Sequence, residues 1–72
     1  MIPVHTVDLV PNVRAAVYHT QKCYLLNVEE YHGGRWEDAG SAGAWPFNPL
    51  DDARIIEECR FMFSDYWRSD ND

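Results

Sequence analysis

NPLDDARIIEECRFMFSDYW, residues 48–67, is the stretch from which the fold of this chain can be argued most directly. Asn48 is a suitable N-cap, because its side-chain oxygen can accept from the free N–H groups of a first helical turn. Pro49 then takes the first helical position, where a missing N–H costs nothing. No Gly or Pro follows before the tail, residues 68–72. The pattern therefore predicts one long helix over residues 49–67.

Successive residues of this predicted helix are rotated by about 100°, which separates an apolar face from a charged one. The apolar face is expected to pack on the core and carries Ile55, Ile56, Cys59, Met62, Phe63, Tyr66 and Trp67. The opposite face carries Asp51, Arg54, Glu57, Glu58, Phe61 and Asp65. Phe61 is the one large aromatic on the charged face. Either another part of the chain covers it, or it contacts a partner, since aromatic residues are enriched at interfaces.

The residues before the helix predict a small antiparallel sheet. Alternating apolar and polar residues indicate strands within residues 3–10, 13–19, 23–31 and 35–39. The third of these, CYLLNVEEY, has the strongest β-forming composition. For the second, a short helix over residues 12–20 is the alternative.

Two connections follow from small residues. Gly33-Gly34 indicates a tight hairpin turn, because two glycines tolerate the positive φ angles that such turns need. Residues 40–47, GSAGAWPF, are expected to form a loop. Trp45 and Phe47 would anchor this loop by covering the edge of the core.

Together these elements predict an α+β fold, with a small antiparallel sheet of three or four strands and one long C-terminal helix packed on it. The short connections favour a meander order of strands. Val17, Leu26 and Val28 are the expected sheet residues beneath the helix. A length of 72 residues predicts a single domain, residues 1–72, with a small core.

The charge balance is strongly acidic, with 12 acids against six bases and a net charge of −6. Direct binding to nucleic acid needs basic surface that displaces counterions from phosphate, so it is not expected. Anionic membrane surfaces are disfavoured for the same reason. The expected partner is a basic protein surface; alternatively, the acidity serves only solubility.

Cysteine usage and hydropathy point to the cytoplasm. Cys23 and Cys59 are too few for a disulfide framework and are expected to be free thiols. The N-terminal residues do not resemble a signal peptide. No apolar run approaches the ~20 residues that a membrane-spanning helix needs.

Enzymatic and metal chemistry find little support. The chain has no nucleophile elbow, P-loop or dinucleotide fingerprint, so we expect no enzyme and no cofactor. His19, Cys23 and His32 lack the close pairing of zinc ligands, so we expect no metal site.

The acids occur as doublets, and two doublets flank the glycine turn: Glu29-Glu30 and Glu37-Asp38. If the two glycines are the central turn residues, Glu30 faces Glu37 and Glu29 faces Asp38. Like charges directly opposite each other destabilise a sheet, which indicates that they are kept for a partner. A three-residue loop would instead set Glu30 against Trp36. Alternatively, the acids are a solvated surface without a role.

In its size, acidity, doublet spacing and lack of catalytic motifs, the chain resembles small acidic inhibitors encoded by phages and mobile elements, of the anti-CRISPR and anti-restriction type. The resemblance implies a non-enzymatic inhibitor that binds a basic, nucleic-acid-handling complex and blocks nucleic-acid binding by mimicry. The expected partner-binding residues are Glu29, Glu30, Glu37, Asp38, Glu57, Glu58, Phe61 and Asp65. The alternative is an accessory protein that self-associates, for example as a homodimer, through the aromatics Trp36, Trp45 and Phe61.

Overall fold

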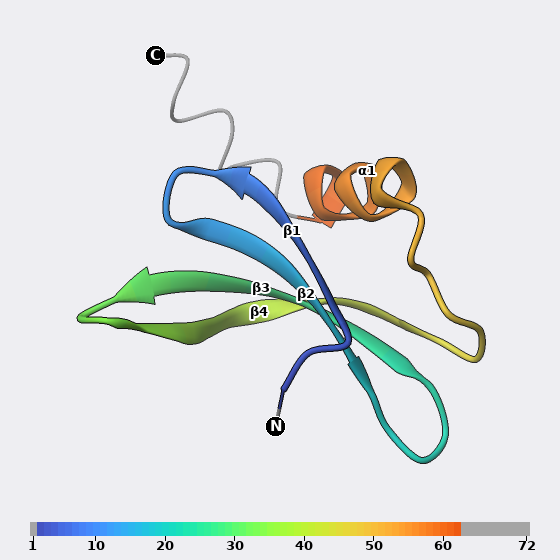
Figure 1. Ribbon diagram of the computed structural model, residues 1–72. Coiled ribbons are helices and arrows are strands. Elements are labelled where there is room, and N and C mark those ends of the chain that lie inside the picture. Colours follow the sequence, from blue (N-terminus) through green and yellow to red (C-terminus); the bar gives the residue numbers. More distant parts are fainter. Residues whose placement is uncertain (1, 63–72) are drawn as a thin grey trace.

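A computed structural model describes residues 2–62 and shows a four-stranded antiparallel sheet with one helix against it (Figure 1). In chain order the elements are β1 (His5–Val10), β2 (Val13–His19), β3 (Tyr24–His32), β4 (Arg35–Trp45) and α1 (Asp52–Met62). The spatial order of the strands is β1-β2-β3-β4, with each strand antiparallel to the next. The predictions of an α+β fold and of a meander are confirmed.

Two tight turns set the pairing of the strands. Asn12, in the turn between β1 and β2, has a φ of 66°, a left-handed conformation that asparagine tolerates. Gly33 and Gly34 have φ values of 58° and 87° and are the only two residues between the paired residues His32 and Arg35. Residues 13–19 are a strand, so the alternative of a helix over residues 12–20 is wrong.

β4 is longer than expected: the prediction of a loop over residues 40–47 is wrong for residues 40–45, which belong to the strand, and holds for residues 46–47. The small residues interrupt the ladder without ending it: the register between β3 and β4 shifts at two places. Gly40 and Gly43 have φ values of 144° and 157°. The ring of Trp45 lies over Gly43, where an added Cβ would come within 3.1 Å of the Cη2 atom of Trp45.

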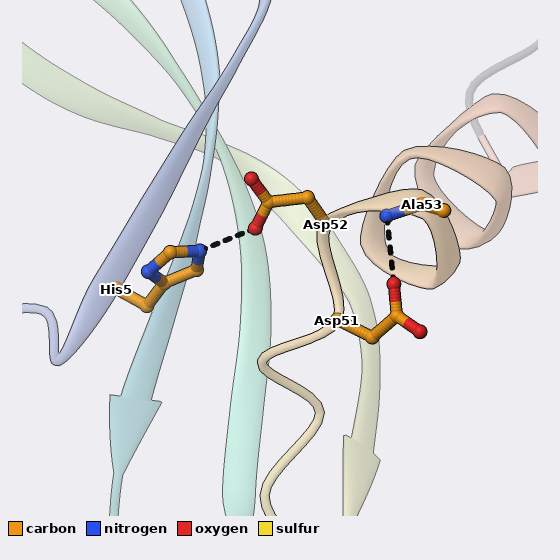
Figure 2. A network of polar contacts seen from close by, with 4 residues as sticks. All are labelled: His5, Asp51, Asp52 and Ala53. Atoms are coloured by element: carbon orange, nitrogen blue, oxygen red, sulfur yellow. Dashed lines mark hydrogen bonds and ion pairs between the residues drawn. The ribbon is translucent and has the colours of Figure 1, made fainter.

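The helix begins later than expected, because Asp51 and not Asn48 is the N-cap. The Oδ1 atom of Asp51 accepts from the N–H of Ala53 at 3.0 Å, and its carbonyl accepts from the N–H of Ile55 at 3.0 Å (Figure 2). Pro49 is buried ahead of the helix instead of occupying its first turn.

α1 has 11 residues, so the helix is shorter than the one expected over residues 49–67. Its N-terminus is tied to the edge strand β1, where Nε2 of His5 lies 2.6 Å from Oδ1 of Asp52 (Figure 2). The expected continuation, including Phe63, Tyr66 and Trp67, lies outside the described residues, as does the side chain of Met62.

The core lies between α1 and one face of the sheet, as expected. Its fully buried side chains include Val17, Leu26, Val28, Ile55 and Cys59. Ile56 is half-buried. Burial, with the charge of Glu58 adding to it, raises the pKa of the Cys59 thiol to about 11, so this side chain packs as a small neutral group.

The periphery of the core differs in part from expectation. Trp45 packs against the core, but Phe47 is 51% exposed and lies beneath the guanidinium of Arg54 at 5.3 Å, so its expected role as a core cover is wrong. Cys23 is half-buried, and both cysteines are free thiols. Among the described residues, no helix has the length and apolar character needed to cross a membrane.

Candidate protein-binding surfaces

The hairpin of β3 and β4 has the two-residue turn, so the cross-strand acid pairs of that register are present. Glu30 pairs with Glu37 and Glu29 pairs with Asp38. Because side chains alternate between the two faces of a strand, Glu29 and Asp38 lie on one face and Glu30 and Glu37 on the other. The four predicted carboxylates are therefore split between the two faces of the sheet.

Their exposure also differs. Glu37 and Asp38 are exposed, and Asp38 accepts from the N–H of Gly40 at 2.9 Å. Glu30 is half-buried, with Oε1 3.3 Å from Nε2 of His32. Glu29 is only 6% exposed, so the expectation that it contributes an exposed carboxylate is wrong.

Glu29 is held by two donors from β2. The Nε–H of Arg14 donates to Oε1 of Glu29 at 2.9 Å, and the hydroxyl of Tyr18 donates to Oε2. The guanidinium of Arg14 also lies 4.3 Å from the ring centre of Trp36, and Trp36 meets Tyr31 edge to face at 5.2 Å. The buried charge of Glu29 is thus paired and hydrogen-bonded, as a buried carboxylate requires.

The strand registers extend this contact into a line of charge across the whole sheet. Asp8 pairs with Arg14, Arg14 with Glu29, and Glu29 with Asp38. We call Asp8, Arg14, Glu29 and Asp38 the charged row. Sequence reasoning missed it, although one signal was present: Arg14 is the sole Lys or Arg before Lys22, in a strand of small and apolar residues.

The face that bears the charged row is opposite to α1, and we call it the open face. The core residues Ala15, Val17 and Val28 point toward α1, and their neighbours Arg14, Ala16, Tyr18 and Glu29 alternate to the other side. Tyr18, Thr20, Leu25, Asn27 and Glu29 line a shallow hollow on it. The open face therefore combines polar, aromatic and charged groups.

The environment of Tyr18 changes its acidity. Burial, together with the hydrogen bond to Glu29 and the charge of that carboxylate, raises the pKa of Tyr18 to about 12. The ordinary value is about 10. Between these two pH values, the folded protein therefore keeps the hydroxyl proton of Tyr18, whereas the unfolded chain has released it.

Because the folded state binds this proton more tightly, its contribution to stability is fully present below about pH 10 and is lost as the pH rises toward about 12. Tyr18→Phe has no proton to lose, so its free energy of unfolding should fall less steeply over this interval. Urea unfolding at several alkaline pH values checks this, and Cys59, present in both proteins, contributes equally to each. Parallel stability curves for the two proteins would contradict the assignment.

The predicted helix face lies elsewhere on the molecule. Glu57 is exposed, Glu58 is half-buried, and both line a shallow hollow with Phe61. Phe61 is 81% exposed, so the alternative in which another part of the chain covers it is wrong for the described residues. Asp65 lies outside the described residues. Figure 1 shows that the β3–β4 turn projects away from α1, so the hairpin and helix acids do not form one surface.

Within residues 2–62, no group of three or more His, Cys, Asp or Glu side chains is placed to hold a metal ion. His19 stacks on Tyr24, with ring centres 4.3 Å apart, and Cys23 lies 3.5 Å from the hydroxyl of Thr20. These side chains have packing and hydrogen-bonding roles in the β2–β3 connection.

Comparison with known proteins gives the chain no relative: no protein family, curated protein or solved structure matches it. The functional argument therefore rests on the surfaces of the chain and on their charges.

Proposed function

We propose that the protein is a non-enzymatic inhibitor that binds the basic surface of a nucleic-acid-handling protein and blocks nucleic-acid binding there. This is the function that the resemblance to anti-CRISPR and anti-restriction inhibitors implies. The observation that carries the proposal is the pairing of acids across the β3–β4 hairpin, with Glu29 opposite Asp38 on the open face and Glu30 opposite Glu37 on the other face. Like charges in this arrangement repel each other; Arg14 offsets the charge of Glu29 and His32 contacts Glu30, whereas Glu37 and Asp38 are exposed to a partner.

The distribution of charge supports the same function. The guanidinium of Arg14 forms an ion pair with the buried Glu29, whereas Asp8, Glu37 and Asp38 are exposed. A basic groove that normally holds phosphates presents the complementary potential. Such complementarity speeds association and disfavours wrong partners.

Reversing the exposed hairpin acids tests the proposal. In Glu37→Lys/Asp38→Lys, binding to a basic partner captured from a candidate host lysate should weaken at least about tenfold, because like charges at an interface cost several kcal/mol. Wild-type complexes should also dissociate at high salt, because the attraction between charges is then screened beyond a few ångströms. Added duplex DNA or RNA should displace the protein from its partner. Pull-down followed by titration in increasing salt measures each effect.

Glu57→Lys/Glu58→Lys is the charge-matched control on α1, and it should weaken binding less than Glu37→Lys/Asp38→Lys does. Both doubles should fold, which circular dichroism verifies. Complexes that resist high salt, or that bind nucleic acid and the protein at the same time, would contradict the proposed competition.

The exposure of Phe61 favours a second candidate function, self-association through aromatic contacts. A side chain of this size that is 81% exposed is a plausible anchor for a second copy. This candidate expects a dimer in sedimentation analysis that persists or strengthens at high salt and dissociates in Phe61→Ala. A monomer at all salt concentrations would exclude it.

A further inference from the structure

We propose that the open face of the sheet, and not the outer face of α1, is the surface that receives the partner, and that its occupant is a cationic protein segment lying along the charged row. This inference rests on the proposed function and specifies which acidic surface performs it. No described helix or strand packs on the open face.

The side chains of the open face have the composition and rigidity of a binding surface. Tyr, Trp and Arg are the residue types most enriched at interface hot spots, and Tyr31, Trp36 and Arg14 lie together here. Arg14 is fixed by Glu29 on one side and by the ring of Trp36 on the other. Side chains that are already held in place lose little conformational entropy when a partner binds.

The charge of the open face determines which kind of partner segment it can bind. The charged row contains three carboxylates and one guanidinium, and that guanidinium already neutralises Glu29. Asp8 and Asp38, at the two ends, are exposed. Neighbouring strands lie about 4.8 Å apart, so three spacings place these two carboxylates roughly 14 Å from each other. A segment with Lys or Arg side chains at a similar separation would meet both, whereas a phosphate backbone would be repelled.

The outer face of α1 has less unopposed negative charge than the open face. On α1, Arg54 and Arg60 offset Glu57 and Glu58, and the two remaining acids are engaged at the N-terminus of the helix, where Asp51 accepts from the N–H of Ala53 and Asp52 contacts His5. Arg54 in addition lies over the ring of Phe47. A cationic partner therefore gains less from this face than from the open face.

Neutralising variants separate the two faces without changing shape. Asp8→Asn/Asp38→Asn removes both ends of the charged row, and Asn at position 38 can still accept from the N–H of Gly40. Glu57→Gln/Glu58→Gln is the matched control: it removes two charges from α1 and none from the open face. Both doubles change the net charge equally, so long-range attraction is the same in each.

The probe is an arginine-rich synthetic peptide titrated into ¹⁵N-labelled protein, with a glutamate-rich peptide of the same length as the control ligand. The indole N–H of Trp36 and the amides of Asp8 and Asp38 should shift first. Asp8→Asn/Asp38→Asn should weaken peptide binding at least about tenfold, and the matched control by no more than about threefold.

Equal weakening in both doubles, or peptide-induced shifts centred on Phe61, would overturn the assignment of the open face while leaving an acid-driven function standing. If neither salt nor any of these substitutions changed the affinity for the peptide, the proposed function would be overturned as well. A dimer that Asp8→Asn/Asp38→Asn alters, in a protein that does not bind the peptide, would make a second copy the occupant and would also overturn the inference. Titration of the wild type and both doubles at low and high salt decides among these results.

Discussion

Ile55→Ala is expected to lower the free energy of unfolding by about 2–5 kcal/mol, the cost of removing a large aliphatic side chain from a packed core. Ile55 has no exposed surface and lies between α1 and the apolar face of the sheet. A domain of this length buries only a small core, so such a loss is a large part of its total stability. Urea unfolding monitored by circular dichroism measures the change.

Phe61→Ala is the matched control, because it removes an even larger side chain from the same helix. Phe61 is 81% exposed, so its removal should change the free energy of unfolding by no more than about 0.5 kcal/mol. The contrast therefore tests the orientation of α1. If the two variants showed equal stability, or if Phe61→Ala were the less stable one, the helix would present a different face to the sheet.

The parts of the fold that could be predicted from sequence are those that short-range rules determine. A pair of glycines between alternating segments allowed a two-residue turn, and that turn alone sets Tyr31 opposite Trp36 and Glu30 opposite Glu37. The helical period likewise placed Ile55 and Cys59 on the face that packs on the sheet. In each case the deciding residues lie within about ten positions of one another.

Two boundaries were wrong because local rules allowed more than one answer. Asn48 and Asp51 are both good N-caps, and the choice of Asp51 goes with the burial of Pro49, a tertiary effect. Gly40 and Gly43 are typical of loops, but bulges let a paired strand pass through them. Packing of Trp45 on the core then holds the end of β4 in place.

The candidate site was predicted only in part, since the face on which each acid lies depends on pairings between distant segments. Glu37 and Asp38 are exposed as expected, but Glu29 is buried because β2 brings Arg14 and Tyr18 to it. Arg14 and Glu29 are 15 positions apart. Their contact depends on the register of β2 on β3, which a hydrogen-bonded turn from Thr20 to Cys23 sets. Its central residues, Gln21 and Lys22, are not typical turn residues, so the sequence did not predict this register.

Arg14→Met should be the most destabilising change on the open face. Methionine keeps an unbranched side chain against Trp36 but leaves the carboxylate of Glu29, whose side chain is 8% exposed, without its cation. Removing one partner of a buried ion pair costs about 3–5 kcal/mol, and the 19% exposure of the Arg14 side chain places this variant near the lower end. Tyr18 still donates to Glu29, which offsets part of the loss.

The second variant, Arg14→Met/Glu29→Gln, decides whether charge is the cause. Glutamine carries no charge and its oxygen can still accept from the hydroxyl of Tyr18, so most of the lost stability should return. A double-mutant cycle on the free energies of unfolding, completed with Glu29→Gln alone, isolates the coupling between the two residues. If the double variant were as unstable as Arg14→Met, the contacts of Arg14 with Trp36, and not its pairing with Glu29, would be what stabilises the open face.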